Sequence, residues 1–309
     1  MSLSIITPHY NDFEGLQRLY DCLINQTNSD WEWIIVDDFS DKTELVNIEN
    51  WLSNTVDKRV RFIKNPQKTN ASVCRNIGAE AANFENLVFL DADDYISKTF
   101  VHNRDIICNE FVVYKNRAVI DRNGTQEHRP SLNKNYLDSF LNAKFLWQTT
   151  AILWHKSFFN KIGKFDPNLH RLQDVELSIR ALYASKNYEV IDNAIDFFYC
   201  TKPIRLKSDI VKKSCASVNY LILKLHSNYN LEAYRQSLLK SYYYACVKGL
   251  HRCKNSKDVV YVKESLNLFY NKRYINFYKY SIGNILLFCY KHHIISDDLF
   301  ISANRYLFK

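Results

Sequence analysis

Carboxylate side chains gather in a short segment of the first hundred residues. Asp91, Asp93 and Asp94 follow directly after an apolar run. Carboxylates packed this closely repel one another unless a cation or protons intervene, so their coexistence favours a bound metal. Their oxygens suit Mg²⁺ or Mn²⁺, hard ions that keep some waters and take further ligands from substrate phosphates. The alternative is an acidic turn that caps the next helix.

Other polar residues in the first two hundred positions extend this pattern. Asp37 and Asp38 close an earlier apolar run, and Arg75 lies in the stretch NASVCRNIGAEAA. A guanidinium near an acidic metal site indicates phosphate binding, because its planar fork matches phosphate oxygens. Asp174 and Glu176 lie in LQDVELSIRAL. Asp174 stands at the start of a predicted helix, where its alternative role is that of an N-terminal cap.

The elements that would position these side chains alternate between apolar runs and helical patterns. Strands are predicted over 3–7, 33–36, 60–63 and 87–90, and helices over 13–25, 43–53 and 71–82. This order, with strands that are apolar almost throughout, predicts a mostly parallel sheet covered on both faces. In such sheets ligands bind beyond the carboxyl ends of the strands. PHYND, DDFSD and DADD stand at three of these ends, so we expect a nucleotide and metal site there.

Five motifs together resemble the inverting glycosyltransferase family 2, which has a GT-A fold, over residues 1 to about 200. They are TPHYND, IIVDDFSD, NASVCRNIGAEAA, FLDADDYI and GKFDPNLHRLQDVELSIRAL. The resemblance implies an α/β class: a Rossmann-like, mostly parallel GT-A sheet with helices on both faces, followed by a C-terminal α-helical region. The expected catalytic domain covers 1–205, with a nucleotide-sugar half at about 1–100 and an acceptor half at 101–205. A basic, aromatic helical region follows over 206–309.

The resemblance also implies a role for individual residues. Tyr10 would stack on the base, Asp38 would accept a hydrogen bond from the base edge, and Asp174 would be the catalytic base. The residues implied to bind the nucleotide sugar are Pro8, Tyr10, Asn11, Asp37, Asp38, Arg75, Asp91, Ala92 and Asp93. Those implied to hold Mn²⁺ or Mg²⁺ on the diphosphate are Asp91, Asp93 and Asp94.

The acceptor side is expected around Trp147 and Glu176. Glu176 lies two residues after Asp174, so on a helix its side chain points in another direction. Acceptor contact, and a position in solvent or behind the residues that touch the acceptor, are equal alternatives for it. His155 and His170 lie in the same part of the chain, although a lone His is more often core or surface than ligand.

One stretch departs from the family pattern. Many relatives carry a His shortly after the last strand of the domain, whereas FFYCTKPIRLKSD has Lys202, Arg205 and Lys207 there. Contact with the diphosphate and the start of the basic tail are equal alternatives for these cations.

Charge divides the chain into two parts. Residues 1–200 carry 22 basic and 27 acidic side chains, while 201–309 carry 19 basic and 6 acidic ones. The basic part reads as helices in which Tyr, Phe and Lys interleave. Such helices lie at anionic membrane surfaces or pack their aromatic rings against protein, and both readings stay open for 206–309. A homo-oligomer is left open as well.

Composition bears on the compartment and on the class of partner. The start MSLSIITPHY has no basic segment followed by an apolar one, so a cytoplasmic protein is expected, with the inner face of the cytoplasmic membrane as a peripheral site. The eight cysteines are spaced irregularly, which fits reduced structural thiols. A nucleic-acid partner is not expected, because the N-terminal part is net acidic.

The expected function is transfer of a sugar from a nucleotide-sugar donor, with UDP-sugars favoured, to a glycan or lipid-linked acceptor. The resemblance implies metal dependence, inversion at the anomeric carbon and a place in bacterial surface polysaccharide synthesis. A sugar nucleotidyltransferase is the main alternative enzyme, but it usually has a glycine-rich phosphate loop that PHYNDFEG does not match. The other alternative is a catalytically degenerate nucleotide- or carbohydrate-binding relative.

Overall fold

The computed structural model describes residues 2–55, 57–121, 123–132, 135–200 and 209–309. Contacts within the chain divide it into two compact units. Unit 1 comprises the described residues within 1–134, 146–168 and 180–203, and unit 2 those within 135–145, 169–179 and 204–309. The expected division at 205 and 206 stays a prediction, and each unit is described by itself.

A seven-stranded sheet forms the centre of unit 1, and every strand except β9 runs in the same direction. In order across the sheet, the strands are β10 (Tyr188–Ile191), β6 (Phe111–Tyr114), β9 (Ile152–His155), β4 (Asn86–Phe89), β1 (Leu3–His9), β2 (Trp31–Asp37) and β3 (Val60–Lys64). Nearly every residue of β1, β2 and β4 is buried. Burial on both faces explains why these strands are apolar throughout rather than alternating.

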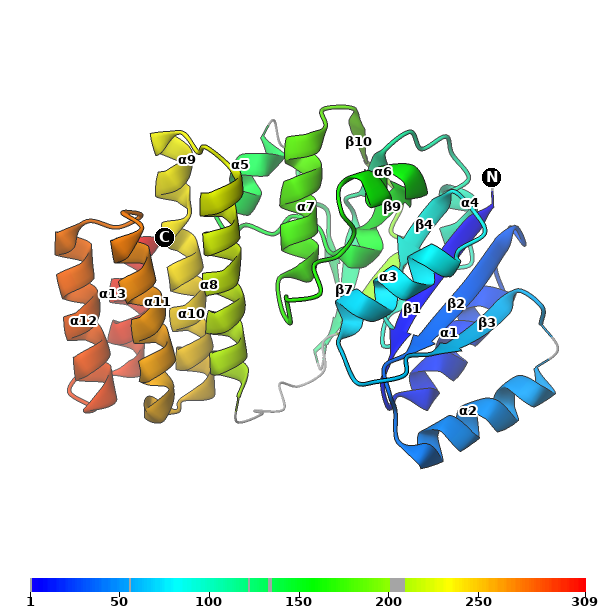
Figure 1. Ribbon diagram of the computed structural model, residues 1–309, viewed down its shortest axis with the longest axis horizontal. Helices are drawn as coiled ribbons and strands as arrows, with labels where there is room; N and C mark the ends of the chain where they lie inside the picture. Colours follow the sequence, from blue (N-terminus) through cyan, green and yellow to red (C-terminus); the bar gives the residue numbers. More distant parts are fainter. Residues whose placement is uncertain (1, 56, 122, 133–134, 201–208) are drawn as a thin grey trace. The chain divides into compact units, whose positions relative to one another are not determined.

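Helices cover the two faces of this sheet. The helical segments of unit 1 are α1 (Phe13–Ile24), α2 (Lys42–Asn54), α3 (Ala71–Ala81), α4 (Phe100–Asn103), η1 (Thr149–Ala151) and α6 (Lys156–Lys161). Trp33 of β2 packs against Tyr20 of α1 and Trp51 of α2. On the opposite face, α3 crosses β1 and β2 (Figure 1), and a Cβ at Gly78 would overlap Ile6.

A smaller sheet of four strands completes unit 1. Its strands, in order, are β5 (Tyr95–Ile96), β11 (Phe197–Cys200), β7 (Arg117–Asp121) and β8 (Gly124–His128). Arg104 lies next to it and pairs with Asp196 at 2.8 Å between Nη1 and Oδ2, with both side chains fully buried. The pair fixes the segment that leads into β11.

Unit 2 is helical. Its elements are α5 (Tyr136–Leu141), α8 (Ile210–Asn228), α9 (Ala233–Leu238), α10 (Lys240–Cys253), η2 (Ser256–Asp258), α11 (Val259–Asn271), α12 (Phe277–Lys291) and α13 (Asp297–Phe308). The long helices α8 and α10 to α13 run side by side (Figure 1) around a core rich in aromatic rings, such as Tyr243, which meets Phe308 at 4.5 Å. Across the described residues, none of the helices combines the length and the apolar character that crossing a bilayer takes.

One helix belongs to both units. α7 (Gln173–Ala184) begins in unit 2 and ends in unit 1, because the division falls at residue 180. The predicted α/β class, the mostly parallel sheet and the C-terminal helices are confirmed. The strands and helices expected over the first ninety residues correspond in order to β1, α1, β2, α2, β3, α3 and β4.

Candidate active site

The carboxyl ends of β1, β2 and β4 meet at one edge of the large sheet. His9 pairs with Asp37 in the register of β1 and β2, and Ile6 pairs with Phe89 of β4. The residues that follow these strands therefore lie close together. They border a cavity of about 250 Å³ whose lining is Pro8, His9, Tyr10, Asp12, Asp38, Ala71, Arg75, Asp91, Ala92 and Asp93.

Seven of the nine residues expected to bind a nucleotide sugar line this cavity. The other two, Asn11 and Asp37, are engaged beside it. Asn11 exchanges two hydrogen bonds with Asp41, and Asp37 accepts from His9 and Ser40. These contacts tie the loop after β1 to the loop after β2, and a direct role for Asn11 and Asp37 in nucleotide binding stays a prediction.

Asp38 is a buried carboxylate with one oxygen saturated by the protein. Its Oδ1 accepts from Thr69 N and Thr69 Oγ1, both at 2.8 Å, and from Asn65 Nδ2 at 3.2 Å. Its Oδ2 faces Lys68, whose amino group lies 2.9 Å away. Burial alone would raise the pKa of Asp38, but the hydrogen bonds from Lys68 and Thr69 lower it below its usual value. Asp38 is therefore an ionised acceptor at neutral pH.

Lys68 also covers the ring expected to stack on the base. Its amino group lies 3.0 Å from the centre of the Tyr10 ring, which is 50% exposed. Tyr10 and Asp38 Oδ2 thus share one partner, a lysine in the loop before α3. No spacing in the sequence marks Lys68, and the prediction missed it along with His9, Asp12 and Ala71.

Helix α3 presents Arg75 to the acidic turn. Asn70 caps the helix, because its side chain accepts from Ser72 N and Val73 N. Five residues on, the buried Arg75 donates from Nη2 to Asp91 Oδ1 at 2.6 Å. This charge-assisted bond fixes the guanidinium at the edge of the cavity, where it can meet a phosphate.

The three carboxylates of the acidic turn have different surroundings. Asp91 and Asp93 line the cavity, whereas Asp94 is buried and accepts from Thr150 Oγ1 at 3.3 Å and Cys200 N at 3.1 Å. Burial first, and then the charge of Asp91, raise the pKa of Asp94 well above its usual range. Asp94 therefore anchors the turn to β11 and to η1.

A divalent cation fits this arrangement through few protein ligands. In the described part of the chain, no three His, Cys, Asp or Glu side chains come close enough together to hold a metal. Mg²⁺ sites of nucleotide enzymes are commonly built from one or two carboxylates plus substrate phosphates and water. Asp93 at the cavity meets that requirement, with Asp91 beside it.

The remaining predicted residues, Asp174, Glu176 and Trp147, are not among those that line this cavity. Asp174, the second residue of α7, belongs to unit 2, where its Oδ1 accepts from Val175 N at 2.9 Å. Glu176 is buried and pairs with Lys224 of α8 at 2.8 Å between Oε1 and Nζ, and its role on the acceptor side stays a prediction. Trp147 is 1% exposed and packs in the core of unit 1.

The two histidines considered in the sequence analysis, His155 and His170, do not line the cavity. His155 caps α6 by accepting from Ser157 N, and His170 is exposed in unit 2. Lys202, Arg205 and Lys207 lie outside the described residues.

The chain belongs to glycosyl transferase family 2, whose model matches residues 4–165. It is 31% identical to the poly(ribitol-phosphate) beta-N-acetylglucosaminyltransferase TarP of Staphylococcus aureus over 206 residues, 61% of this chain and 59% of TarP. It is 27% identical to the amylovoran biosynthesis glycosyltransferase AmsB of Erwinia amylovora over 199 residues, 59% of this chain and 64% of AmsB. The chain thus spans about three fifths of the length of these curated relatives.

Solved structures show the same fold. The crystal structure of S. aureus TarS with UDP-GlcNAc has a TM-score of 0.65 at 15% identity, over 99% of this chain and 90% of that one. The mannosyltransferase PcManGT of Pyrobaculum calidifontis, in complex with GDP-Man and Mn²⁺, has a TM-score of 0.56 at 11% identity, over 99% and 84%. The predicted family and its GT-A fold are confirmed.

Proposed function

We propose that this chain transfers a sugar from a UDP-sugar, with divalent metal and inversion, to a hydroxyl of a glycan or lipid-linked acceptor in bacterial surface polysaccharide synthesis. The observation that carries the proposal is the cavity at the carboxyl edge of the sheet. It combines four kinds of group: the exposed ring of Tyr10, the ionised carboxylate of Asp38, the guanidinium of Arg75, and the carboxylates of Asp91 and Asp93. These groups match, in that order, a base, its imide edge, a diphosphate and a metal ion.

The base preference follows from Asp38. An ionised carboxylate only accepts hydrogen bonds, so Asp38 Oδ2 favours a base edge that offers an N–H. Uracil, thymine and guanine offer a ring N–H there, whereas the ring nitrogen of cytosine accepts and only its exocyclic amino group donates. The ligands of the similar structures, UDP-GlcNAc in TarS and GDP-Man in PcManGT, agree with this preference.

In the proposed reaction, residues of this chain bind the donor and remove the acceptor's proton. Arg75 holds the diphosphate, Asp91 positions the ribose, and Asp93 supplies the protein ligand for the metal. A bound Mn²⁺ or Mg²⁺ would neutralise charge that develops on the departing nucleoside diphosphate. Asp174 removes the proton from the acceptor hydroxyl, which then attacks the anomeric carbon from the face opposite the leaving group. One displacement inverts the configuration.

A donor assay tests the function. Release of nucleoside diphosphate is measured for UDP-, GDP-, dTDP- and CMP-sugars with glycan or lipid-linked acceptors in the presence of Mn²⁺, Mg²⁺ or EDTA. We expect turnover with a UDP-sugar and a metal. Asp174→Asn should keep donor binding and lose about 10²- to 10⁴-fold in transfer, the usual contribution of a general base.

Two outcomes would end the proposal in different ways. If the protein binds no nucleotide sugar with either metal, a degenerate or partner-dependent relative becomes the leading account. Release of pyrophosphate from a nucleoside triphosphate and a sugar phosphate would instead identify a nucleotidyltransferase. Undiminished transfer by Asp174→Asn would remove Asp174 from its role while leaving the donor site standing.

A further inference from the structure

A pocket in unit 2 lies between α8, α10 and the segment that leads into α7. Helix α8 contributes Ile210, Ser214 and Val218, which are spaced four residues apart and so share one face. Helix α10 contributes Ala245 and Gly249, which are also four residues apart. The volume is about 360 Å³, within the range of small-molecule sites, and every residue that lines the pocket belongs to unit 2. We call this cavity the α8–α10 pocket.

Three cations line the α8–α10 pocket, and no carboxylate does so among the described residues. Arg171 precedes α7, while Lys248 and Arg252 lie four residues apart on α10. Within the described part of the chain, none of the three forms an ion pair with a carboxylate. Burial first, and then neighbouring cations such as Arg252, lower the pKa of Lys248. An anion bound among these cations would offset their repulsion, so the pocket favours an anionic ligand.

Most of the remaining lining is apolar. Five of the lining residues have side chains made only of carbon: Phe145, Leu172, Ile210, Val218 and Ala245. The described lining contains no Asn, Gln, Asp or Glu, the side chains that would hydrogen-bond the hydroxyl groups of a sugar. Apolar walls together with cations fit an amphiphile that carries an anionic group. A phosphate ester of an apolar alcohol has this chemistry.

Gly249 leaves room in the pocket. It lies inside α10, where glycine destabilises a helix relative to alanine. Nothing lies within 4 Å of the position that a Cβ would take, whereas a Cβ at Gly283 of α12 would lie 3.0 Å from Leu266. Close packing thus excludes a side chain at Gly283 but not at Gly249. The absence of a side chain at Gly249 instead keeps the pocket open.

The pocket adjoins the start of α7, which carries the proposed catalytic base. Leu172 lines the pocket and stands two residues before Asp174. Its backbone is left-handed, with a φ of 62°, and its carbonyl oxygen accepts from Glu176 N at 2.9 Å in the first turn of α7. The ring of Phe145, which also lines the pocket, has its centre 6.1 Å from that of Tyr242. Burial and then the charge of Asp174 raise the pKa of Tyr242, so a ligand in the pocket would lie near Asp174.

We propose that the α8–α10 pocket binds the acceptor, and that the acceptor is a saccharide joined through phosphate to an apolar chain. The phosphate contacts Arg171, Lys248 and Arg252, and the adjoining part of the chain packs against the apolar walls. The saccharide then presents its hydroxyl to Asp174. This inference rests on the proposed function, because it takes Asp174 as the base. It narrows the acceptor to the lipid-linked class.

Binding of octyl phosphate to the full chain tests the pocket in the absence of a donor. Calorimetric titrations compare octyl phosphate with butyl phosphate, octanol and inorganic phosphate. Each buried CH₂ group strengthens binding about fourfold, so octyl phosphate should bind at least about tenfold more tightly than butyl phosphate. Octanol and inorganic phosphate should each bind at least about tenfold more weakly than octyl phosphate, because each lacks half of the recognised chemistry.

Two variants change the pocket in different ways. Gly249→Leu fills it and should weaken octyl phosphate binding at least about tenfold, without lowering the melting temperature, since leucine favours a helix. Arg171→Gln with Arg252→Gln removes two exposed cations and should weaken binding at least about tenfold as well. Both variants should bind UDP as wild type does. The second variant carries the test if Gly249→Leu proves unstable.

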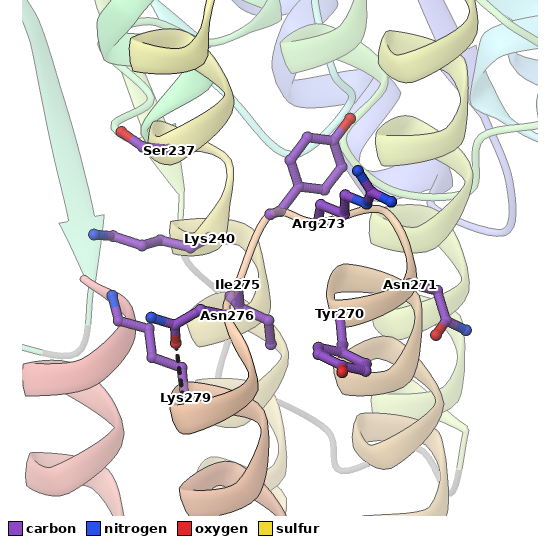
Figure 2. A pocket seen from close by; sticks show the side chains of 9 residues that line it. Ser237, Lys240, Tyr270, Asn271, Arg273, Ile275, Asn276 and Lys279 are labelled. Carbon is purple, nitrogen blue, oxygen red and sulfur yellow. Dashed lines mark hydrogen bonds between the residues drawn. The ribbon is translucent and has the colours of Figure 1, made fainter.

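Another pocket of unit 2 supplies the matched control. Figure 2 shows Lys240 and Lys279 in it, beside Asn276, whose side chain accepts from Lys279 N and caps α12. Lys240→Gln with Lys279→Gln removes the same charge from this second pocket. Because salt screens charges that are far from the ligand, octyl phosphate binding should stay unchanged within about twofold.

Competition in the donor assay connects the pocket to the acceptor. Octyl phosphate should raise the KM of a lipid-linked acceptor and leave the KM of the UDP-sugar unchanged. Gly249→Leu should raise the KM of the same acceptor at least about tenfold and leave UDP binding unchanged.

The proposal is wrong if wild type and both pocket variants bind octyl phosphate equally, or if octanol binds as tightly as octyl phosphate. Competition with the UDP-sugar would place octyl phosphate in the donor cavity instead. If phosphatidylglycerol displaces octyl phosphate while transfer continues undiminished, the pocket holds a membrane lipid and not the acceptor. If no nucleotide sugar binds, the proposed function fails and the acceptor role fails with it, whereas octyl phosphate binding still reports on the pocket alone.

Discussion

At the scale of single residues, the candidate donor site already has its polar contacts filled from within the chain. Lys68 meets both the Tyr10 ring and Asp38 Oδ2, and Arg75 is held by Asp91. A base that stacks on Tyr10 and donates to Asp38 must replace Lys68 at both. Binding is therefore an exchange of partners, and its free energy is smaller than the new contacts alone would give.

Removing this lysine should strengthen nucleotide binding. Lys68→Met keeps the aliphatic stem but ends the competition, and an exposed cation–π contact contributes about 0.5 to 1 kcal/mol. We expect UDP to bind about two- to fivefold tighter in a calorimetric titration. The control is Lys64→Met at the end of β3, which removes an exposed lysine and should leave the affinity for UDP unchanged. Weaker binding of UDP to Lys68→Met would show instead that Lys68 contacts the bound nucleotide.

The lowered pKa of Asp38 predicts a pH dependence of stability. Its folded pKa lies below the unfolded value of about 3.9, so the charged form stabilises the fold above that pH. The stabilisation is lost as pH falls through the folded pKa. The difference in melting temperature between wild type and Asp38→Asn should be constant from about pH 7 to pH 5 and shrink below about pH 4. A difference that grows on acidification would contradict the assignment.

At the scale of elements, helix α1 approaches the acidic turn at Gly15. A Cβ at this position would lie 2.6 Å from the Ala92 carbonyl oxygen and 2.9 Å from Asp12 Cγ. Ala92 and Asp12 both line the donor cavity. The absence of a side chain at Gly15 therefore lets α1 support the turn that carries Asp91 and Asp93.

Gly15→Ala should damage both stability and the site. Overpacking of this kind costs about 1 to 3 kcal/mol, and relief requires the turn to move. We expect a lower melting temperature together with weaker UDP binding. Gly249→Ala is the matched control, because nothing lies within 4 Å of its Cβ position in α10. It should leave UDP binding alone and raise stability by up to about 1 kcal/mol through helix propensity. Unchanged UDP binding in Gly15→Ala would contradict the supporting role.

The strands and helices that carry the site could be predicted from the sequence, whereas the side-chain contacts within the site could not. Apolar runs such as Trp31–Asp37 identify buried parallel strands, and their shared direction brings the residues after them together. The pairing of Lys68 with Asp38 left no periodic signal, because it depends on how one loop folds back. The surroundings of Asp94 were equally hidden, since Cys200 reaches it from more than a hundred residues away.

At the scale of the whole molecule, charge divides the chain into two parts. In the proposed function, the net acidic first two hundred residues bind an anionic donor through a few directed cations such as Arg75 and through a metal at Asp93. The remainder, residues 201–309, carries 19 basic and 6 acidic side chains. The sequence indicated this division, but which cations lack a carboxylate partner depends on long-range pairs such as Glu176 with Lys224.

The most direct test of the account is a calorimetric titration of UDP into wild type and Asp93→Ala, each with Mn²⁺ and with EDTA. We predict that UDP binds wild type in Mn²⁺ and at least about tenfold more weakly in EDTA. Asp93→Ala should bind weakly under both conditions, while Asp21→Ala, which removes an exposed carboxylate of α1, should match wild type. Binding that is indifferent to both Mn²⁺ and Asp93, or no binding of UDP to wild type at all, would contradict the proposed donor site.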